Sequence, residues 1–75
     1  MNASAKLMRE RIENDFTYHA PTPEKAKRHE DLRTFAKSFA FALTEYCPES
    51  RELSVALTKL EEAMMWGNAA IARND

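Results

Sequence analysis

Residues 22–50, TPEKAKRHEDLRTFAKSFAFALTEYCPES, contain both the start and the end of one long helix. Thr22 is a favoured N-cap residue, and Pro23 suits the first helical position, where an acidic residue follows it. Pro48 cannot continue a helix, and it pushes the residue before it out of the helical conformation. The stretch therefore predicts a helix over 23–46.

The chain beyond Pro48 predicts a second long helix over 50–73. Ser50 is another N-cap candidate, and apolar residues then recur at every third or fourth position. Two amphipathic helices of this length that are joined by a short turn fold back on each other as an antiparallel hairpin. We therefore expect an all-α fold built around this hairpin.

Each long helix carries one continuous apolar row that should face its partner in the hairpin. In the helix over 23–46 the row consists of Leu32, Phe35, Phe39, Leu43 and Tyr46. In the helix over 50–73 it consists of Leu53, Leu57, Leu60, Met64, Gly67 and Ile71. Gly67 lies within its row, where a missing side chain lets another backbone come close, although a glycine inside a helix costs about 1 kcal/mol. These two rows are the predicted seam of the hairpin.

The N-terminal part of the chain predicts a short helix over 4–15 and an extended link over 16–22. Ser4 can cap the short helix, which carries a ragged apolar stripe. Two prolines, one in the link and one just after it, keep the link extended. Together with the hairpin, these segments are expected to form a single helical domain over 1–75.

The composition excludes several classes of protein. The 75 residues include eleven Lys or Arg and twelve Asp or Glu, so the net charge of -1 indicates no overall preference for nucleic acid. The single cysteine, Cys47, excludes a disulfide framework and fits a reducing cytoplasm, and the two histidines do not favour a metal site. No apolar run reaches the roughly 18 residues of a membrane span, and the polar start does not look like a signal peptide. We expect a cytoplasmic protein with no metal or cofactor.

A second apolar face on each long helix predicts self-association. A core of fewer than roughly 70–80 residues seldom supplies more than a few kcal/mol, so small domains commonly oligomerise. Apolar side chains lie away from the predicted seam at Phe41, Val55, Met65, Trp66 and Ala69. A helix that is apolar on two sides is covered on two sides, either by the N-terminal segment or by another protomer. We expect that both the N-terminal segment and another protomer cover the second apolar face. We therefore expect a homo-oligomer whose interface includes these five residues.

No set of residues with catalytic spacing is present in the sequence. It contains no Ser/His/Asp or Cys/His signature, and a single glycine excludes a glycine-rich phosphate loop. The local charge is more informative, because residues 25–37 contain five Lys or Arg against two acidic residues, shortly after the aromatic pair Tyr18 and His19. Aromatic rings beside cations suit a ligand with flat bases and phosphates. The alternative interpretation is a solvated helix face, with Tyr18 as a hydrophobic staple.

Three stretches of the sequence resemble one known family. They are Phe16-x-Tyr18-His19-x-Pro21, the step Leu32-Arg33, and a block that runs from CPESRE at 47–52 through ALTKLEEA at 56–63 to MW at 65–66 and NAAIARN at 68–74. In these stretches the chain resembles the helical-hairpin proteins that bacteriophages use against CBASS immunity, the anti-CBASS cyclic-oligonucleotide sponges. A related hairpin occurs in phage proteins that sequester the Thoeris signal. The similarity covers residues 16–74.

The resemblance implies a binding protein and not an enzyme. Family members assemble as compact homo-hexamers and bind cyclic dinucleotides such as cyclic GMP–AMP, and in some cases cyclic trinucleotides, in pockets between protomers. Sequestering the messenger in the cytoplasm of the bacterial host keeps the CBASS effector from firing. The implied partners are therefore the messenger and further copies of the chain, with no membrane and no DNA or RNA polymer.

The resemblance also implies a set of ligand-binding residues. Tyr18 corresponds to the aromatic residue that stacks on a base, and Arg33 stands where the family has a basic residue on a phosphate. Arg73 matches an arginine of a separate trinucleotide pocket. His19, beside the stacking position, and Lys37, one helical turn after Arg33, complete the predicted ligand-binding set.

Two other functions agree with the same residues. A helical oligomerisation or protein-interaction module would use Phe41, Met65 and Trp66 to bind a partner. A small nucleic-acid-binding regulator would use the basic residues of 25–37 and would lose affinity steeply with added salt. Binding of cyclic nucleotides separates the sponge interpretation from both of these alternatives.

Overall fold

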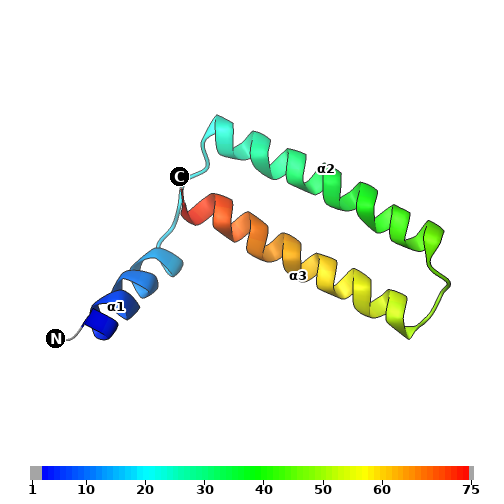
Figure 1. The fold of residues 1–75 in the computed structure, drawn as a ribbon. Coiled ribbons are helices and arrows are strands. Elements are labelled where there is room, and N and C mark those ends of the chain that lie inside the picture. The colour runs from blue at the N-terminus through cyan, green and yellow to red at the C-terminus, as the bar shows by residue number, and fades with distance from the viewer. Residues whose placement is uncertain (1–2, 75) are drawn as a thin grey trace.

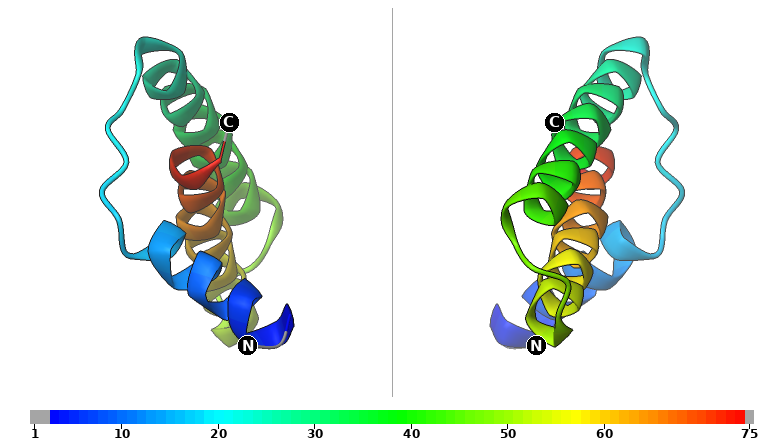
Figure 2. Two further views of the ribbon diagram at one scale, coloured as in Figure 1. Left: turned by 90° about the vertical axis from the view of Figure 1, so that its left-hand side faces the viewer. Right: turned by 90° about the vertical axis from the view of Figure 1, so that its right-hand side faces the viewer.

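The computed structural model of the chain describes residues 3–74, which form helices and no strand (Figure 1). The helices are α1 (Ala3–Asp15), α2 (Pro23–Tyr46) and α3 (Arg51–Arg73). α2 and α3 pack side by side in opposite directions, whereas α1 projects from the open end of this pair and contacts it sparingly. Figure 2 shows the link between α1 and α2 as an open arc beside the hairpin. The all-α class and the helical hairpin are thus confirmed.

Both ends of α2 are set by the residues that the sequence indicates. The Thr22 side chain accepts a hydrogen bond from the Lys25 backbone N–H at 3.1 Å, and Pro23 is the first residue of the helix. At the other end the Cys47 N–H donates to the Leu43 carbonyl oxygen at 2.9 Å, while Cys47 itself is extended. The proline that follows favours this extended backbone, so the helix ends there.

α3 begins immediately after Ser50. The Ser50 hydroxyl oxygen accepts a hydrogen bond from the Leu53 backbone N–H at 3.1 Å. The same hydroxyl donates to the Pro48 carbonyl oxygen at 2.9 Å, so one side chain joins the turn to the helix. The helix expected from residue 50 therefore has Ser50 as its cap and Arg51 as its first helical residue.

α1 differs from its prediction at the N-terminal end. The helix begins at Ala3, which places Ser4 within the first turn, so the prediction of Ser4 as the N-cap is wrong. An N-cap residue keeps a non-helical backbone, and Ser4 is already helical. At the other end the Phe16 backbone N–H donates to the Ile12 carbonyl oxygen at 3.0 Å, and the extended link follows.

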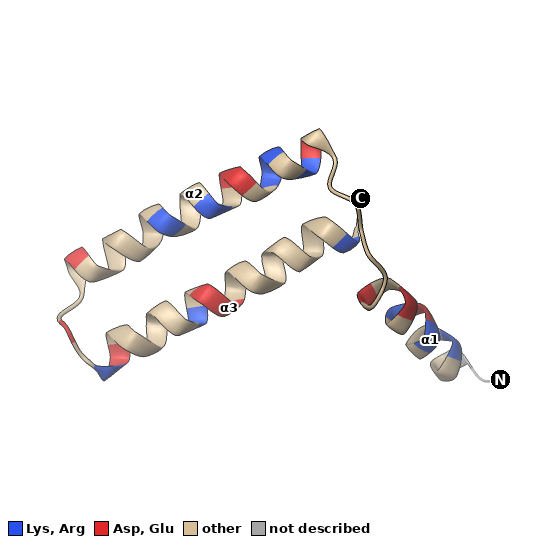
Figure 3. Ribbon diagram, turned by 180° about the vertical axis from the view of Figure 1, so that it is seen from behind, with Lys and Arg blue, Asp and Glu red and all other residues tan. Residues whose placement is uncertain are grey.

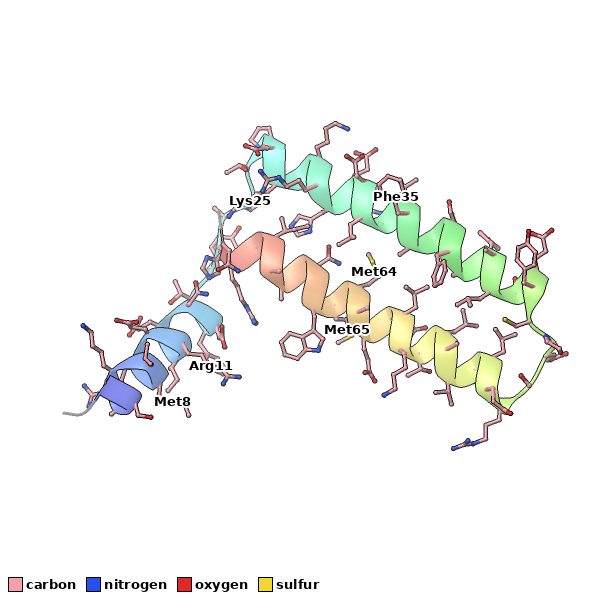
Figure 4. All side chains as sticks on the ribbon, in the orientation of Figure 1. Met8, Arg11, Lys25, Phe35, Met64 and Met65 are labelled. Carbon is pink, nitrogen blue, oxygen red and sulfur yellow. The ribbon has the colours of Figure 1, made fainter. Side chains whose placement is uncertain are left out.

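The seam predicted for α3 is confirmed. Its six members, Leu53, Leu57, Leu60, Met64, Gly67 and Ile71, are all partly buried. In Figure 4, Met64 lies between α2 and α3. The three- and four-residue spacing therefore identifies the face of α3 that packs against α2.

The seam predicted for α2 is wrong in part. Leu32 and Leu43 are partly buried, but Phe35 and Phe39 are 72% and 56% exposed, and Tyr46 is 84% exposed. The partly buried row of α2 instead runs through Leu32, Ala36, Ala40 and Leu43, and Cys47 continues it just after the helix. Small side chains at the contact let two helices approach closely, and the large aromatic rings turn away from it.

Gly67 allows one close contact between the two long helices. A Cβ atom placed on Gly67 would lie 3.0 Å from Leu32 Cδ2. The expectation that another backbone approaches at this position is wrong, because the neighbour is a side chain. The absence of a side chain at Gly67 lets Leu32 of α2 pack directly against the backbone of α3.

Polar contacts join α2 and α3 near the open end of the hairpin. His29 Nδ1 lies 2.8 Å from Asn68 Oδ1, and the Lys25 ammonium donates to the Ala72 carbonyl oxygen at 3.5 Å. Because the amide oxygen of Asn68 is an acceptor, the ring nitrogen of His29 is the donor. These contacts place the C-terminal end of α3 beside the start of α2 (Figure 4).

The hairpin has a seam but no core, because no residue in the described part of the chain is fully buried. The accessible surface is 6469 Å², whereas a compact monomer of 8.6 kDa exposes about 4,700 Å². The radius of gyration is 16.7 Å, against about 11 Å for a compact domain of this length. Much apolar surface of the single chain is therefore open to solvent. Within residues 3–74, no helix has the length and apolar character that crossing a membrane requires.

Candidate ligand-binding site

The basic residues of α2 fall into two groups. Lys27 and Arg28, near its start, each form an ion pair with an acidic residue one turn away, and Lys25 bonds to α3. Arg33 and Lys37, in the middle of the helix, form no ion pair or side-chain hydrogen bond with any described residue. Figure 3 shows the positive charges along α2 and the nearly uncharged second half of α3 beside them. On α2, the positive charge that no described residue pairs therefore lies at Arg33 and Lys37.

Arg33 and Lys37 line a groove of about 610 Å³ between α2 and α3. The other residues that line it are Ala36, Ala40, Leu57, Leu60, Glu61, Met64 and Met65. Ala36 and Ala40 are one helical turn apart, and their small side chains leave open space that larger residues would fill. The groove therefore combines mostly apolar walls with two cations that no described residue pairs.

Tyr18 and His19 differ in their surroundings although they are adjacent. Tyr18 is 83% exposed on the extended link, so the interpretation of this ring as a hydrophobic staple is wrong. His19 turns back to α1, where its Nε2 lies 2.6 Å from the Asn14 carbonyl oxygen. Because a carbonyl oxygen only accepts, Nε2 carries the proton. His19 therefore satisfies a carbonyl at the end of α1 and lines a hollow of about 590 Å³ with residues of that helix.

Arg73 lies where α1 and α3 meet. Its Nη1 is 3.5 Å from Asp15 Oδ1, and Arg11 Nε is 3.5 Å from Asp15 Oδ2. Trp66, on α3, lines the two hollows beside this ion pair, which have volumes of about 200 and 420 Å³. Arg11 lies on α1 (Figure 4). The junction thus contains two guanidinium groups, one carboxylate and one indole ring.

Of the five predicted ligand-binding residues, the structure brings two together. Arg33 and Lys37 share the groove, whereas Tyr18, His19 and Arg73 lie in three other places of the same chain. One chain therefore holds separate parts of the predicted site.

The residues predicted for an oligomer interface are mostly exposed in the single chain. Phe41, Val55, Met65 and Trp66 are exposed, and Ala69 is partly buried. Two of them also contribute to the hollows, because Met65 lines the groove and Trp66 lines the α1–α3 junction. Their role in an interface stays a prediction.

Three residues at these sites were not identified as site residues from the sequence. Arg11 and Asp15 are four positions apart, a spacing that predicts their ion pair on α1. The contact of Asp15 with Arg73 has no such signal, because it depends on where α1 docks on α3. Glu61 also lines the groove, a position that depends on how α3 packs against α2. A carboxylate there can accept a hydrogen bond from an exocyclic amine of a base.

The chemistry offered by these sites is charge, stacking and apolar contact. Among the described residues there is no group of three His, Cys, Asp or Glu side chains that could hold a metal ion. Guanidinium and ammonium groups bind anions, and tyrosine and tryptophan rings stack on flat bases. Together these groups can bind a ligand that has both phosphates and bases.

The family model of the Acb2/Tad1 hairpin domain matches residues 8–72. No curated protein and no solved structure matches the chain. The matched residues include the second half of α1, the extended link, all of α2 and nearly all of α3. Tyr18, His19, Arg33 and Lys37 lie inside the match, and Arg73 lies one residue beyond it. The chain therefore belongs to the Acb2/Tad1 hairpin family, the sponge proteins directed against CBASS and Thoeris immunity.

Proposed function

We propose that this protein binds cyclic di- and trinucleotide second messengers and sequesters them without cleaving them. Membership of the Acb2/Tad1 family supports the proposal. The observation that carries it is the groove in which Arg33 and Lys37, one turn apart and unpaired among the described residues, adjoin apolar walls. A cyclic dinucleotide such as cyclic GMP–AMP offers phosphates to the cations and flat bases to the apolar side chains.

Arg33 and Lys37 supply different contacts to such a ligand. A guanidinium group can donate two parallel hydrogen bonds to the oxygens of one phosphate, whereas an ammonium group acts as a point charge. The methionine side chains of the groove, Met64 and Met65, are flexible and polarizable, so they can adapt to the edge or face of a base. The groove thereby offers contacts to both the phosphate and the base of a nucleotide.

Tyr18 completes the pocket from a neighbouring protomer in this proposal. Its ring is exposed and does not line the groove of its own chain. The large accessible surface of the single chain supports a homo-oligomer, for which the family implies a hexamer. Phe41, Trp66 and the other predicted interface residues would then be covered by neighbouring copies.

Sequestration explains why a site of this kind needs no catalytic groups. A messenger that is hidden, and not converted, requires affinity for its ground state and no stabilisation of a transition state. Stacking and charge are sufficient for that purpose. In the cytoplasm of an infected bacterium, a phage protein with this affinity lowers the free messenger and keeps the CBASS effector inactive.

Isothermal titration calorimetry with cyclic GMP–AMP tests the proposal. Arg33→Ala removes a charge-assisted contact of about 1.5–3 kcal/mol, so the affinity should fall by a factor of about 10 to 150. Lys27→Ala is the matched control, because it removes the same charge from the same helix but outside the groove. It should leave the affinity nearly unchanged. No heat with any of several cyclic di- and trinucleotides would contradict the proposal.

The stacking role of Tyr18 and the fate of the ligand need separate measurements. Tyr18→Ala removes a platform worth about 1–3 kcal/mol per base and should weaken binding without changing helicity or oligomer mass. Ligand released by denaturing the complex should have the mass of the intact cyclic nucleotide. Recovery of a linear nucleotide would instead identify an enzyme.

A helical protein-interaction module is the second candidate function. It is favoured by the exposed Phe41, Met65 and Trp66, which would bind a partner protein in place of a further copy. This function requires that the protein lack affinity for cyclic nucleotides under conditions in which it is folded. The same calorimetric titration therefore separates the two candidates.

A further inference from the structure

The predicted ligand residue Arg73 is already paired with a carboxylate of its own chain. Asp15, the last residue of α1, has Oδ1 3.5 Å from Arg73 Nη1. Its other oxygen, Oδ2, lies 3.5 Å from Arg11 Nε, so one carboxylate bridges guanidinium groups on two helices. The Asp15 and Arg73 side chains are 26% and 32% exposed, so solvent screens this pair less than it screens a fully exposed one.

The negative charge of Asp15 is unfavourable at the C-terminal end of its own helix, α1. The last turn of α1 contains no basic residue. A carboxylate at the C-terminal end of a helix faces the negative end of the helix dipole. The two arginine contacts offset this repulsion, so the position of the carboxylate is set by Arg11 and Arg73.

The hollows on the two sides of the ion pair have the chemistry of a nucleotide site with one exception. Both are lined by Trp66, on which a base can stack, and by Arg73, which can bind a phosphate. Asp15 also lines both, and it is the one acidic residue among their described lining residues. Without its charge, Arg11 and Arg73 would both be available to an anion.

We propose that Asp15 is a specificity-determining residue that competes with the ligand phosphate for Arg73. The inference rests on the proposed function and on the place of Arg73 in a trinucleotide pocket, which the family resemblance implies. A phosphate on Arg73 lies within a few ångströms of the Asp15 carboxylate, and like charges at that distance repel each other. Glu61 lines the dinucleotide groove, but neither Arg33 nor Lys37 forms an ion pair with it or with any other described residue, so a phosphate there displaces no carboxylate from its cation. Asp15 therefore lowers trinucleotide affinity relative to dinucleotide affinity.

Calorimetric titrations of wild type and Asp15→Asn with cyclic tri-AMP and with cyclic GMP–AMP test this role. The asparagine keeps the size of the side chain and removes its charge, so affinity for cyclic tri-AMP should rise about three- to tenfold. Affinity for cyclic GMP–AMP should change by less than about twofold. Glu13→Gln is the matched control, because it removes the same charge from α1 but lines neither hollow beside Arg73. It should leave both affinities nearly unchanged.

Further variants separate competition from a structural role of Asp15. Asp15→Glu keeps the charge and should gain no affinity for cyclic tri-AMP, whereas Asp15→Ser should show the same gain as Asp15→Asn. Helicity by circular dichroism and mass by light scattering identify any variant that has lost its fold. If Asp15→Asn or Asp15→Ser has lost its fold, the cyclic tri-AMP affinity of the other one tests the competition. Unchanged or weaker binding of cyclic tri-AMP by a folded neutral variant would overturn the competition.

The outcome also distinguishes this inference from the proposed function. Failure of every variant and of wild type to bind either cyclic nucleotide would refute the sponge function itself. Binding of cyclic GMP–AMP by wild type, together with no gain for cyclic tri-AMP in Asp15→Asn, would refute the role of Asp15 alone.

Discussion

The contact between Leu32 and Gly67 shows two opposing effects at one residue. A glycine inside a helix costs about 1 kcal/mol relative to alanine. An alanine Cβ at position 67 would lie 3.0 Å from Leu32 Cδ2, which is tighter than an ordinary contact. Leu32 is only partly buried, and the crowded methyl is the end of its flexible side chain, so a small shift can relieve the contact. We therefore expect helix propensity to outweigh the crowding.

Gly67→Ala should raise the free energy of unfolding by about 0.5 kcal/mol. The higher helix propensity of alanine contributes about 1 kcal/mol, and the crowded contact with Leu32 offsets part of it. Urea denaturation at one fixed protomer concentration measures this change, since assembly makes stability depend on concentration. In a Leu32→Ala background the contact is absent, and the same substitution should give the full gain of about 1 kcal/mol. Destabilisation by Gly67→Ala in the wild-type background would show that Leu32 cannot move.

At the scale of the elements, helix ends could be predicted from the sequence better than the faces that the helices bury. Thr22, Pro48 and Ser50 mark helix ends through local hydrogen bonds and backbone geometry, which a few residues decide. The aromatic residues of α2 dominate its apolar pattern, yet α3 packs on the row that contains Ala36 and Ala40. Hydropathy shows that a helix has apolar faces, and it does not show which partner covers each face.

The candidate site was predictable to a similar extent. Arg33 and Lys37 are four positions apart on one helix, so local spacing predicts that they share a face. The partner of Arg73 could not be predicted, because Asp15 reaches it only through the angle at which α1 meets α3. The place of Tyr18 relative to the groove depends in the same way on neighbouring copies in the proposed assembly.

Ser50→Ala should lower the free energy of unfolding by about 1 kcal/mol, because it removes the acceptor for the Leu53 N–H and the bond to the Pro48 carbonyl. Ser50→Asp keeps an acceptor and places a negative charge at the positive end of the helix dipole, so it should retain most of the stability. Ser38→Ala, on an exposed position of α2, is the control and should change stability by less than about 0.5 kcal/mol. Equal effects of Ser50→Ala and Ser38→Ala in urea denaturation would exclude the cap as the determinant of the start of α3.

At the scale of the whole molecule, the dominant feature is apolar surface that one chain leaves uncovered. The accessible surface exceeds that of a compact monomer of the same mass by about 1,800 Å². A standard interface buries about 800 Å² on each partner, so this excess is sufficient for two neighbours per protomer. Two interfaces per protomer allow closed assemblies larger than a dimer, in agreement with the proposed hexamer.

The single tryptophan of the chain, Trp66, can report on this assembly. Light scattering at micromolar concentration should give a multiple of 8.6 kDa, with a hexamer expected. If neighbouring copies cover Trp66, its fluorescence emission should lie at shorter wavelength in the assembly and move to longer wavelength on dilution. Helicity should fall over the same concentration range, because a hairpin with no fully buried residue among those described has little to stabilise it alone.

Trp66→Ala should destabilise the assembly by about 3–5 kcal/mol if the ring is fully covered, which is enough to dissociate or unfold so small a domain. Tyr46→Ala is the control, because Tyr46 is an exposed aromatic residue at the opposite, closed end of the hairpin and outside the predicted interface. It should retain the wild-type mass and helicity. A helical monomer with solvent-exposed tryptophan emission would show that the hairpin is stable without a core. That result would contradict both the covering of the second apolar face and the pocket between protomers that depends on it.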